Sequence, residues 1–154
     1  PTVSGGKILI GTNNDSPRDK GKIGDRGILM CLDEKTGKYL WQLAVPKLAA
    51  GKVNDWELLG ICASASIEGD KAYIVTNQCE VVALDMNGLA NGNEGYKDEA
   101  KYFTPPPAPN SPPPPVAEVV PTDADVLWRY SMRDELGVFP HNMTSSSPVI
   151  GGSA

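Results

Sequence analysis

The chain has 154 residues, of which 40% are hydrophobic and 21% are charged, and its net charge is −5. This length is enough for one domain with a sizeable core, and no run of about 18 apolar residues is present, so no membrane span is predicted. Nucleic-acid-binding proteins usually concentrate Lys and Arg on one face. Here 14 basic residues are scattered among 19 acidic ones, which argues against a nucleic-acid partner.

Glycine and proline are both frequent, with 16 and 14 residues, and helical periodicity is nearly absent. This combination predicts an all-β fold of short strands joined by turns and long loops. The sequence begins at Pro1 without a signal-peptide pattern, so any leader is expected to have been removed or to lie upstream. We expect the chain to be a fragment.

Residues 26–42 (RGILMCLDEKTGKYLWQ) carry the first strong structural signal. An apolar run reaches Asp33, a Lys-Thr-Gly turn follows, and a second short apolar run ends at Trp41, which predicts a β-hairpin. Gly37 supplies the positive φ that a tight turn requires, and the Asp33 carboxylate can accept hydrogen bonds from the N–H groups of the turn. The indole of Trp41 needs more covering surface than one hairpin offers.

The hairpin belongs to an internal repeat, because residues 5–13 align without a gap on residues 69–77. The later parts recur in the same order, with Leu32-Asp33, Gly37 and Leu40-Trp41 matched by Leu84-Asp85, Gly88 and Leu127-Trp128. Residues 64–70 in turn match residues 146–152. The chain therefore divides into a first unit at 1–61, a second at 62–143 and the start of a third at 144–154.

Each unit is expected to form four strands, at roughly 1–3, 7–12, 27–32 and 38–43, and again at roughly 62–67, 71–76, 80–85 and 126–131. A four-stranded antiparallel meander repeated head to tail is typical of a β-propeller, in which neighbouring blades cover the faces of each sheet. The sequence thus predicts a propeller fragment of about two blades plus the first strand of a third. Propellers hold about four to eight blades, so we expect further blades from a longer chain or from other copies of this one.

The repeat resembles that of the PQQ-like, quinoprotein-type β-propellers, whose blade pattern is Ala-x-Asp-x-x-x-Gly-x-x-x-Trp. The first unit matches with Cys31 in the Ala position, and the second has a shorter turn and a long insertion before its Trp. The matching residues are Asp33, Gly37 and Trp41 in the first unit and Ala83, Asp85, Gly88 and Trp128 in the second. The resemblance implies that these residues dock each blade to its neighbour, with the Trp over the turn glycine and small residue of the adjoining repeat.

The same family includes quinoprotein alcohol dehydrogenases, the non-enzymatic propeller lipoprotein of the BAM complex and propellers of planctomycete-type bacteria. The resemblance therefore implies an exported bacterial protein, periplasmic or extracellular. Quinoprotein dehydrogenases hold PQQ and Ca²⁺ on the propeller axis, so PQQ is expected only in a complete propeller. They also carry adjacent cysteines under the cofactor, whereas Cys31, Cys62 and Cys79 are spread along this chain.

Three insertions interrupt the repeats. Residues 13–25 are polar and are expected to project as an exposed loop, and residues 44–60 form the linker between the units, with room for one helical turn. The longest insertion, 86–125, contains a Pro-rich stretch at 105–115 (PPPAPNSPPPP). That stretch is predicted to be an extended spacer, because each proline ring fixes φ, and display of a PxxP-like ligand is the alternative.

The start of the longest insertion carries closely spaced oxygen-bearing side chains with glycines between them, as calcium loops do. The candidate ligands are Asp85, Asn87, Asn91, Asn93 and Asp98. Their spacing does not satisfy the EF-hand pattern, because Leu89 stands where a ligand is expected. Asn-Gly turns also serve a conformational purpose, so the sequence leaves Ca²⁺ binding and a purely structural turn both open.

Other signs of catalysis are sparse. The single His141 has no neighbouring nucleophile or metal-ligand spacing, and the three cysteines form no CxxC motif. Our first interpretation is a non-catalytic scaffold that binds protein partners in the bacterial envelope. The alternatives are part of a PQQ- and calcium-dependent oxidoreductase and a building block of a homo-oligomeric ring or filament.

Overall fold

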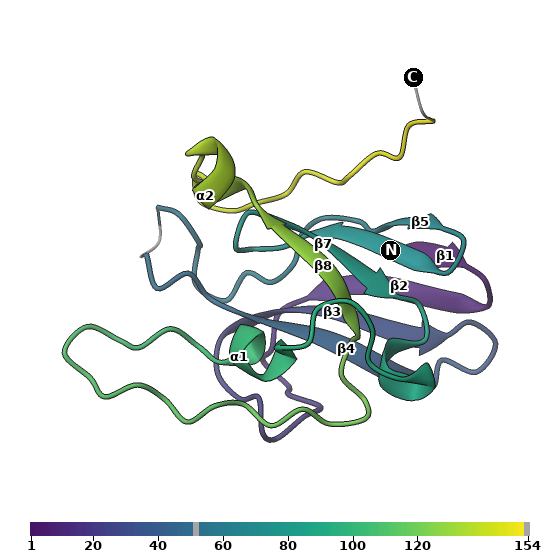
Figure 1. The fold of residues 1–154 in the computed structure, drawn as a ribbon, viewed down its shortest axis with the longest axis horizontal. Helices are drawn as coiled ribbons and strands as arrows, with labels where there is room; N and C mark the ends of the chain where they lie inside the picture. Colours follow the sequence, from purple (N-terminus) through teal and green to yellow (C-terminus); the bar gives the residue numbers. More distant parts are fainter. Residues whose placement is uncertain (51–52, 153–154) are drawn as a thin grey trace.

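The computed structural model describes residues 1–50 and 53–152 and shows an all-β protein built from two four-stranded antiparallel sheets (Figure 1). The first sheet contains, in order, β1 (Thr2–Ser4), β2 (Lys7–Thr12), β3 (Arg26–Asp33) and β4 (Tyr39–Pro46). The second contains, in order, β5 (Ser66–Glu68), β6 (Lys71–Val75), β7 (Glu80–Asp85) and β8 (Val126–Ser131). Both sheets are meanders and neither is closed, which confirms two four-stranded antiparallel units.

The hairpin between β3 and β4 forms around the predicted turn. Asp33 Oδ1 accepts hydrogen bonds from the Thr36 N–H at 2.8 Å and from the Thr36 hydroxyl at 2.6 Å. Gly37 has φ +69, which a residue with a Cβ adopts only with strain. The hydrogen bonds from Thr36 hold the pKa of the Asp33 carboxyl below its ordinary value.

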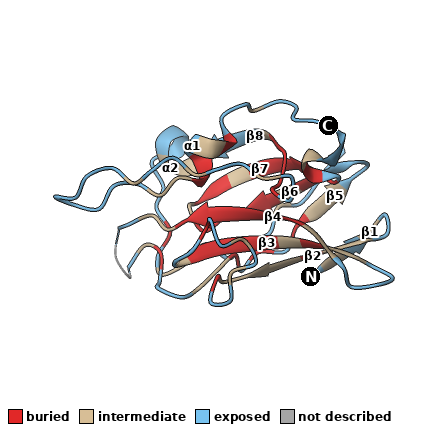
Figure 2. Cartoon of the chain, turned by 90° about the horizontal axis from the view of Figure 1, so that it is seen from below, coloured by how far each residue is buried: buried red, intermediate tan, exposed pale blue. Residues whose placement is uncertain are grey.

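The two sheets pack face to face and share one core. Figure 2 shows the buried strands β3 and β4 of the first sheet stacked beside β6 and β7 of the second. The first sheet contributes Leu9, Leu29, Cys31, Trp41, Leu43 and Val45, and the second contributes Ala72, Ile74, Val82, Leu84 and Val126. Alternate residues of each strand supply these side chains, so one face of each sheet is turned toward the other.

Two strand predictions need correction. The first strand of the second unit begins at Ser66 rather than near residue 62, because the preceding segment is used to line the core, with Ile61, Ala63 and Ala65 buried. The expected first strand of a third unit does not form within 144–152. Nothing among the described residues pairs with that segment as a β-ladder, although Ser147 Oγ accepts a hydrogen bond from the Ser64 N–H at 2.9 Å.

Short helices occupy positions that the repeat pattern does not predict. They are η1 (Gly88–Asn91) and α1 (Glu99–Phe103) within the long insertion and α2 (Met132–Leu136) after β8. The expected helical turn within 44–60 is absent from the described part of that linker. Residues 51–52 of the linker and 153–154 of the third unit lie outside the described residues. The Pro-rich stretch forms no helix or strand and is largely exposed. No described helix is long and apolar enough to span a membrane.

Candidate functional site

The corresponding residues of the two repeats occupy equivalent positions in the two sheets. In the first sheet Leu9 pairs with Cys31 and Cys31 with Trp41, and in the second Tyr73 pairs with Ala83 and Ala83 with Trp128. The register shifts immediately after Cys31 in one sheet and after Ala83 in the other. The two units therefore repeat in structure as well as in sequence, and the register shift beside each tryptophan is repeated too.

Trp41 lies on the turn glycine of the second unit. Its side chain is only 2% exposed, and its Nε1–H donates a hydrogen bond to the Met86 carbonyl oxygen at 3.0 Å. A Cβ added to Gly88, which has φ +58, would lie 2.7 Å from the indole Cδ1. The ring can approach the backbone this closely only because residue 88 is glycine.

The equivalent face of the second sheet is uncovered. Trp128 is 44% exposed and touches Tyr73, with ring centroids 6.0 Å apart. Tyr130 is also exposed. We call this surface, formed by Tyr73, Trp128 and Tyr130 above the buried Ala83, the open face. It is the counterpart of the face that the first sheet buries against the second.

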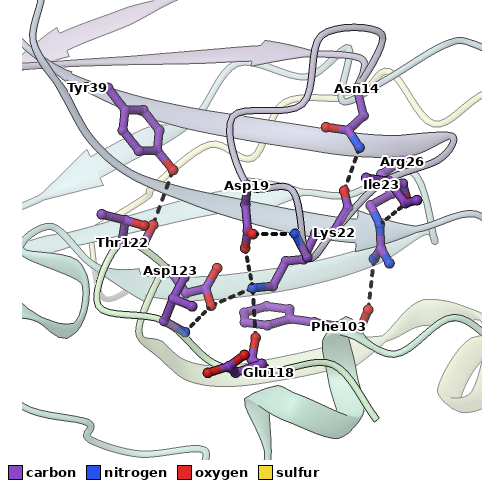
Figure 3. Close-up of polar contacts among 12 residues, drawn as sticks. Asn14, Asp19, Lys22, Ile23, Arg26, Tyr39, Phe103, Glu118, Thr122 and Asp123 are labelled. Atoms are coloured by element: carbon purple, nitrogen blue, oxygen red, sulfur yellow. Dashed lines mark hydrogen bonds and ion pairs between the residues drawn. The ribbon is translucent and has the colours of Figure 1, made fainter. Parts of the chain in front are cut away.

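A buried lysine joins insertions from the two repeats (Figure 3). Lys22, in the 13–25 loop, is 1% exposed and has its ammonium group surrounded by oxygen atoms from both insertions. Its Nζ donates to Asp19 Oδ2 at 2.7 Å, to the Glu118 carbonyl oxygen at 2.9 Å and to Asp123 Oδ2 at 2.8 Å. All three N–H groups of the ammonium are thus satisfied, and the Phe103 ring centroid lies 5.4 Å from Nζ.

Further contacts fix the same two insertions. Arg26 Nη1 donates to the Phe103 carbonyl oxygen at 2.8 Å, and the Tyr39 hydroxyl donates to the Thr122 carbonyl oxygen at 3.3 Å (Figure 3). The long insertion also extends the edge of the first sheet, because Gln42 exchanges backbone hydrogen bonds with Thr122 and Ala124 at 2.9 and 2.8 Å. The 13–25 loop is largely exposed, as predicted, but it does not project freely, because the buried Lys22 anchors it to the long insertion.

The pKa values of the two carboxyl groups around Lys22 shift in opposite directions, because the two groups differ in burial. Burial raises the pKa of Asp123 above its ordinary value, although Lys22 and the Val120 N–H pull it down. Asp123 Oδ1 has no hydrogen-bond partner. Asp19 is less buried, so hydrogen bonds from Lys22 and the Gly21 N–H outweigh desolvation and its pKa lies below the ordinary value. Burial also raises the pKa of Tyr39 to about 12.

The candidate calcium ligands are engaged in hydrogen bonds and ion pairs. The Asp85 carboxylate accepts from the Asn87 N–H at 2.6 Å and from Asn91 Nδ2 at 3.0 Å. Asn87 Oδ1 accepts from Lys7 Nζ at 2.8 Å, Asn93 Nδ2 donates to Glu99, and Asp98 lies 3.8 Å from Lys101. These bonds shape the turn that carries Gly88. Within residues 1–50 and 53–152, no group of three or more His, Cys, Asp or Glu side chains is placed to hold a metal ion.

The remaining reactive side chains lie apart from one another. Cys31 and Cys79 are buried, Cys62 is exposed, and all three thiols are free. Burial raises the pKa of the Cys31 thiol to about 11, so it is held as the unreactive thiol. His141 is exposed and lies in an irregular segment, where the Met143 N–H donates to its carbonyl oxygen at 2.9 Å.

Sequence reasoning missed a second buried ionic group, which lies at the start of β7 in the second sheet. Glu80 is fully buried, and its Oε1 is 2.7 Å from Arg129 Nη1 and 3.9 Å from Arg133 Nη2. The Tyr102 hydroxyl donates to Glu80 Oε2 at 3.1 Å. The glutamate occupies a β-strand position facing the core, which is the one signal that could have found it.

No protein-family model matches the chain, and no curated protein or solved structure matches it either.

Proposed function

We propose that this chain supplies consecutive blades of a β-propeller of the quinoprotein-like type and serves as a non-catalytic scaffold for protein partners in the bacterial envelope. The observation that carries the proposal is the seating of Trp41 on Gly88 together with the repeat of the same constellation at Trp128. One repeat thus docks on the next, and the second presents the same docking residues to a further blade. Repeating this docking from one blade to the next generates a propeller.

The outer surface of the first sheet supplies the complementary half of such an interface. Gly37 corresponds to Gly88, has φ +69 and has no atom within 4 Å of a Cβ placed on it. Ile8, Ile10 and Met30 lie half-buried on the same outer face. A blade placed there would put its tryptophan over Gly37, as Trp41 lies over Gly88.

The scaffold role is supported by how the insertions are held. Buried polar groups fix the 13–25 loop and the 86–125 insertion to each other and to the first sheet. Anchored loops present a defined surface, and binding costs less conformational entropy when the surface is already ordered. The rim that these loops form is the part of the molecule we assign to protein partners.

Sedimentation equilibrium of the 154-residue chain tests the docking role of the open face. The proposal predicts reversible, concentration-dependent association, because the first sheet of another copy can dock on the open face. Trp128→Glu should abolish the association by placing a charge in the interface. Trp56→Glu is the matched control, since Trp56 is similarly exposed, at 47%, but lies outside the repeat. A monomer at all concentrations, or equal behaviour of both variants, would contradict the docking role.

Catalysis is tested separately by adding PQQ and Ca²⁺ to the protein and following dye-linked oxidation of alcohols and sugars. The scaffold proposal predicts no turnover above that of free PQQ. Turnover that depends on the protein would favour the oxidoreductase alternative and overturn the non-catalytic part of the proposal without affecting the architecture.

A further inference from the structure

A basic pocket of about 330 Å³ lies where the end of β4, the turn between β6 and β7, helix α2 and the long insertion meet. Four of its lining residues are basic, namely Lys47, Lys101, Arg129 and Arg133, and none is acidic. This is a local excess of positive charge in a chain whose net charge is −5. The size suits a small molecule.

Two guanidinium groups in the basic pocket are held in fixed orientations. Arg129 donates to Glu80 at 2.7 Å and lies against the Tyr96 and Tyr102 rings, with its Cζ 5.7 and 5.5 Å from their centroids. Arg133 donates through Nε to the Gln78 carbonyl oxygen at 2.7 Å. Each guanidinium keeps further N–H donors beyond these bonds, because the group carries five. The donors are therefore ordered before any ligand arrives.

The charges around the basic pocket do not cancel. The buried Glu80 is a single carboxylate behind two guanidinium groups. Lys47 is paired with Asp55 at 2.7 Å and adds little. The Lys101 side chain is 80% exposed and lies 3.8 Å from an exposed Asp98 carboxylate, a distance at which an exposed pair contributes little. The pocket therefore retains positive charge on Arg129, Arg133 and Lys101.

We propose that the basic pocket binds a small organic anion through a carboxylate or phosphate group held by Arg129 and Arg133, with Lys101 at the mouth. Guanidinium groups bind both kinds of anion because two N–H donors match two oxygens. Leu48, Pro106 and the Tyr96 ring line the remainder of the pocket and give the carbon skeleton of the ligand an apolar surface.

This site does not depend on the propeller proposal. Arg129 lies opposite Val82 in the β7–β8 register, and the Val82 side chain is on the face turned toward the first sheet. Arg129 is therefore on that face too, opposite the open face that carries Trp128. A blade on the open face, beside Trp128, would leave the basic pocket accessible. Loss of anion binding and loss of docking are therefore separable by experiment.

The test is an NMR titration of the protein with inorganic phosphate, acetate and sulfate, each at constant ionic strength maintained with chloride. We expect saturable shifts of backbone amides around Gln78, Lys101 and Arg133 with phosphate, acetate or both. Saturation with phosphate alone assigns a phosphate ester, and saturation with acetate alone assigns a carboxylate. Sulfate shows whether the charge and shape of a tetrahedral oxyanion are sufficient for binding.

Variants tie the shifts to the basic pocket. Arg133→Gln should weaken binding at least about tenfold, because it removes a charged donor, and Lys101→Gln should weaken it by less. Lys35→Gln, in the exposed β3–β4 turn, removes the same charge elsewhere and should leave binding unchanged. Arg129 is not substituted, because its loss would leave the buried Glu80 carboxylate without its closest cation. Linear shifts that never saturate, or equal affinity in Arg133→Gln and Lys35→Gln, would overturn the proposal.

Discussion

Trp41 and Trp128 hold the same place in two copies of one repeat, yet their surroundings differ. Each follows the register shift of its sheet and pairs with a small residue, Cys31 or Ala83. Trp41 is 2% exposed beneath the second sheet, whereas Trp128 is 44% exposed on the open face. The two exposed fractions differ because a second sheet covers Trp41 and no sheet in the described part of the chain covers Trp128. The repeat specifies a tryptophan ready to dock, and a neighbouring sheet determines whether it is buried.

The comparison predicts very unequal costs of truncation. Trp41→Ala removes a buried ring and its hydrogen bond to Met86, so we expect a loss of roughly 3–5 kcal/mol in the free energy of unfolding. Trp128→Ala loses mainly the contact with Tyr73 and should cost about 1 kcal/mol or less when the open face is uncovered. Urea denaturation of the monomeric protein measures both values. Equal costs would show that the two faces are equally covered, against the account.

The contacts between the insertions sharpen the comparison, because they reinforce only the occupied interface. Lys22→Met leaves the buried Asp123 carboxylate without its cation, and breaking a buried pair in this way costs roughly 3–5 kcal/mol. Lys20→Met, two residues away on an exposed side chain, should change stability by less than about 0.5 kcal/mol. If thermal and urea unfolding show no difference between these variants, Lys22 does not join the two insertions as described.

The turn glycines offer a second matched pair, with a smaller expected effect. Gly88→Ala and Gly37→Ala both place a Cβ at positive φ, which costs about 1 kcal/mol, but only Gly88 lies under an indole. Overpacking should make Gly88→Ala about 1–3 kcal/mol more destabilising than Gly37→Ala. Near-equal losses would mean that Trp41 does not press on that turn.

The smallest effect is electrostatic and concerns the two carboxyl groups at Lys22. Asp123 has a raised pKa, so the native state holds the extra proton between its ordinary and its raised pKa, and its contribution to stability falls as pH rises through that window. Asp19 has a lowered pKa, and its contribution is present above the ordinary value and lost as pH falls through the folded pKa. Carboxyl ¹³C NMR should therefore show Asp123 titrating above Asp19. The reverse order would contradict the burial described for Asp123.

Much of the architecture could be predicted from the sequence, because it depends on local pattern. Alternating apolar residues and the Asp33–Gly37 turn determine strands and hairpins, and the alignment of 5–13 with 69–77 reveals the repeat. The start of β5 was placed too early, since Ile61 to Ala65 are apolar in a strand-like way but are used to fill the core.

The ion-pair partners of Lys22 and of Glu80 could not be predicted from the sequence. A lysine in a polar loop such as 13–25 is normally solvated, and its burial depends on Asp123, about a hundred residues away in sequence. The basic pocket likewise combines Lys101, Gln78 and Arg133, which no short motif connects. These features arise from how insertions fold back on the sheets, and the repeat pattern says nothing about that.

The central claim is that the tryptophan of one repeat is seated on the turn glycine of the next. Nuclear Overhauser measurements on the native protein test it directly. The account predicts strong contacts between the Trp41 indole Hδ1 and the Gly88 Hα protons, together with ring-current shifts of those protons. Absence of those contacts, with the Trp41 indole N–H exchanging with solvent as fast as that of Trp128, would contradict it.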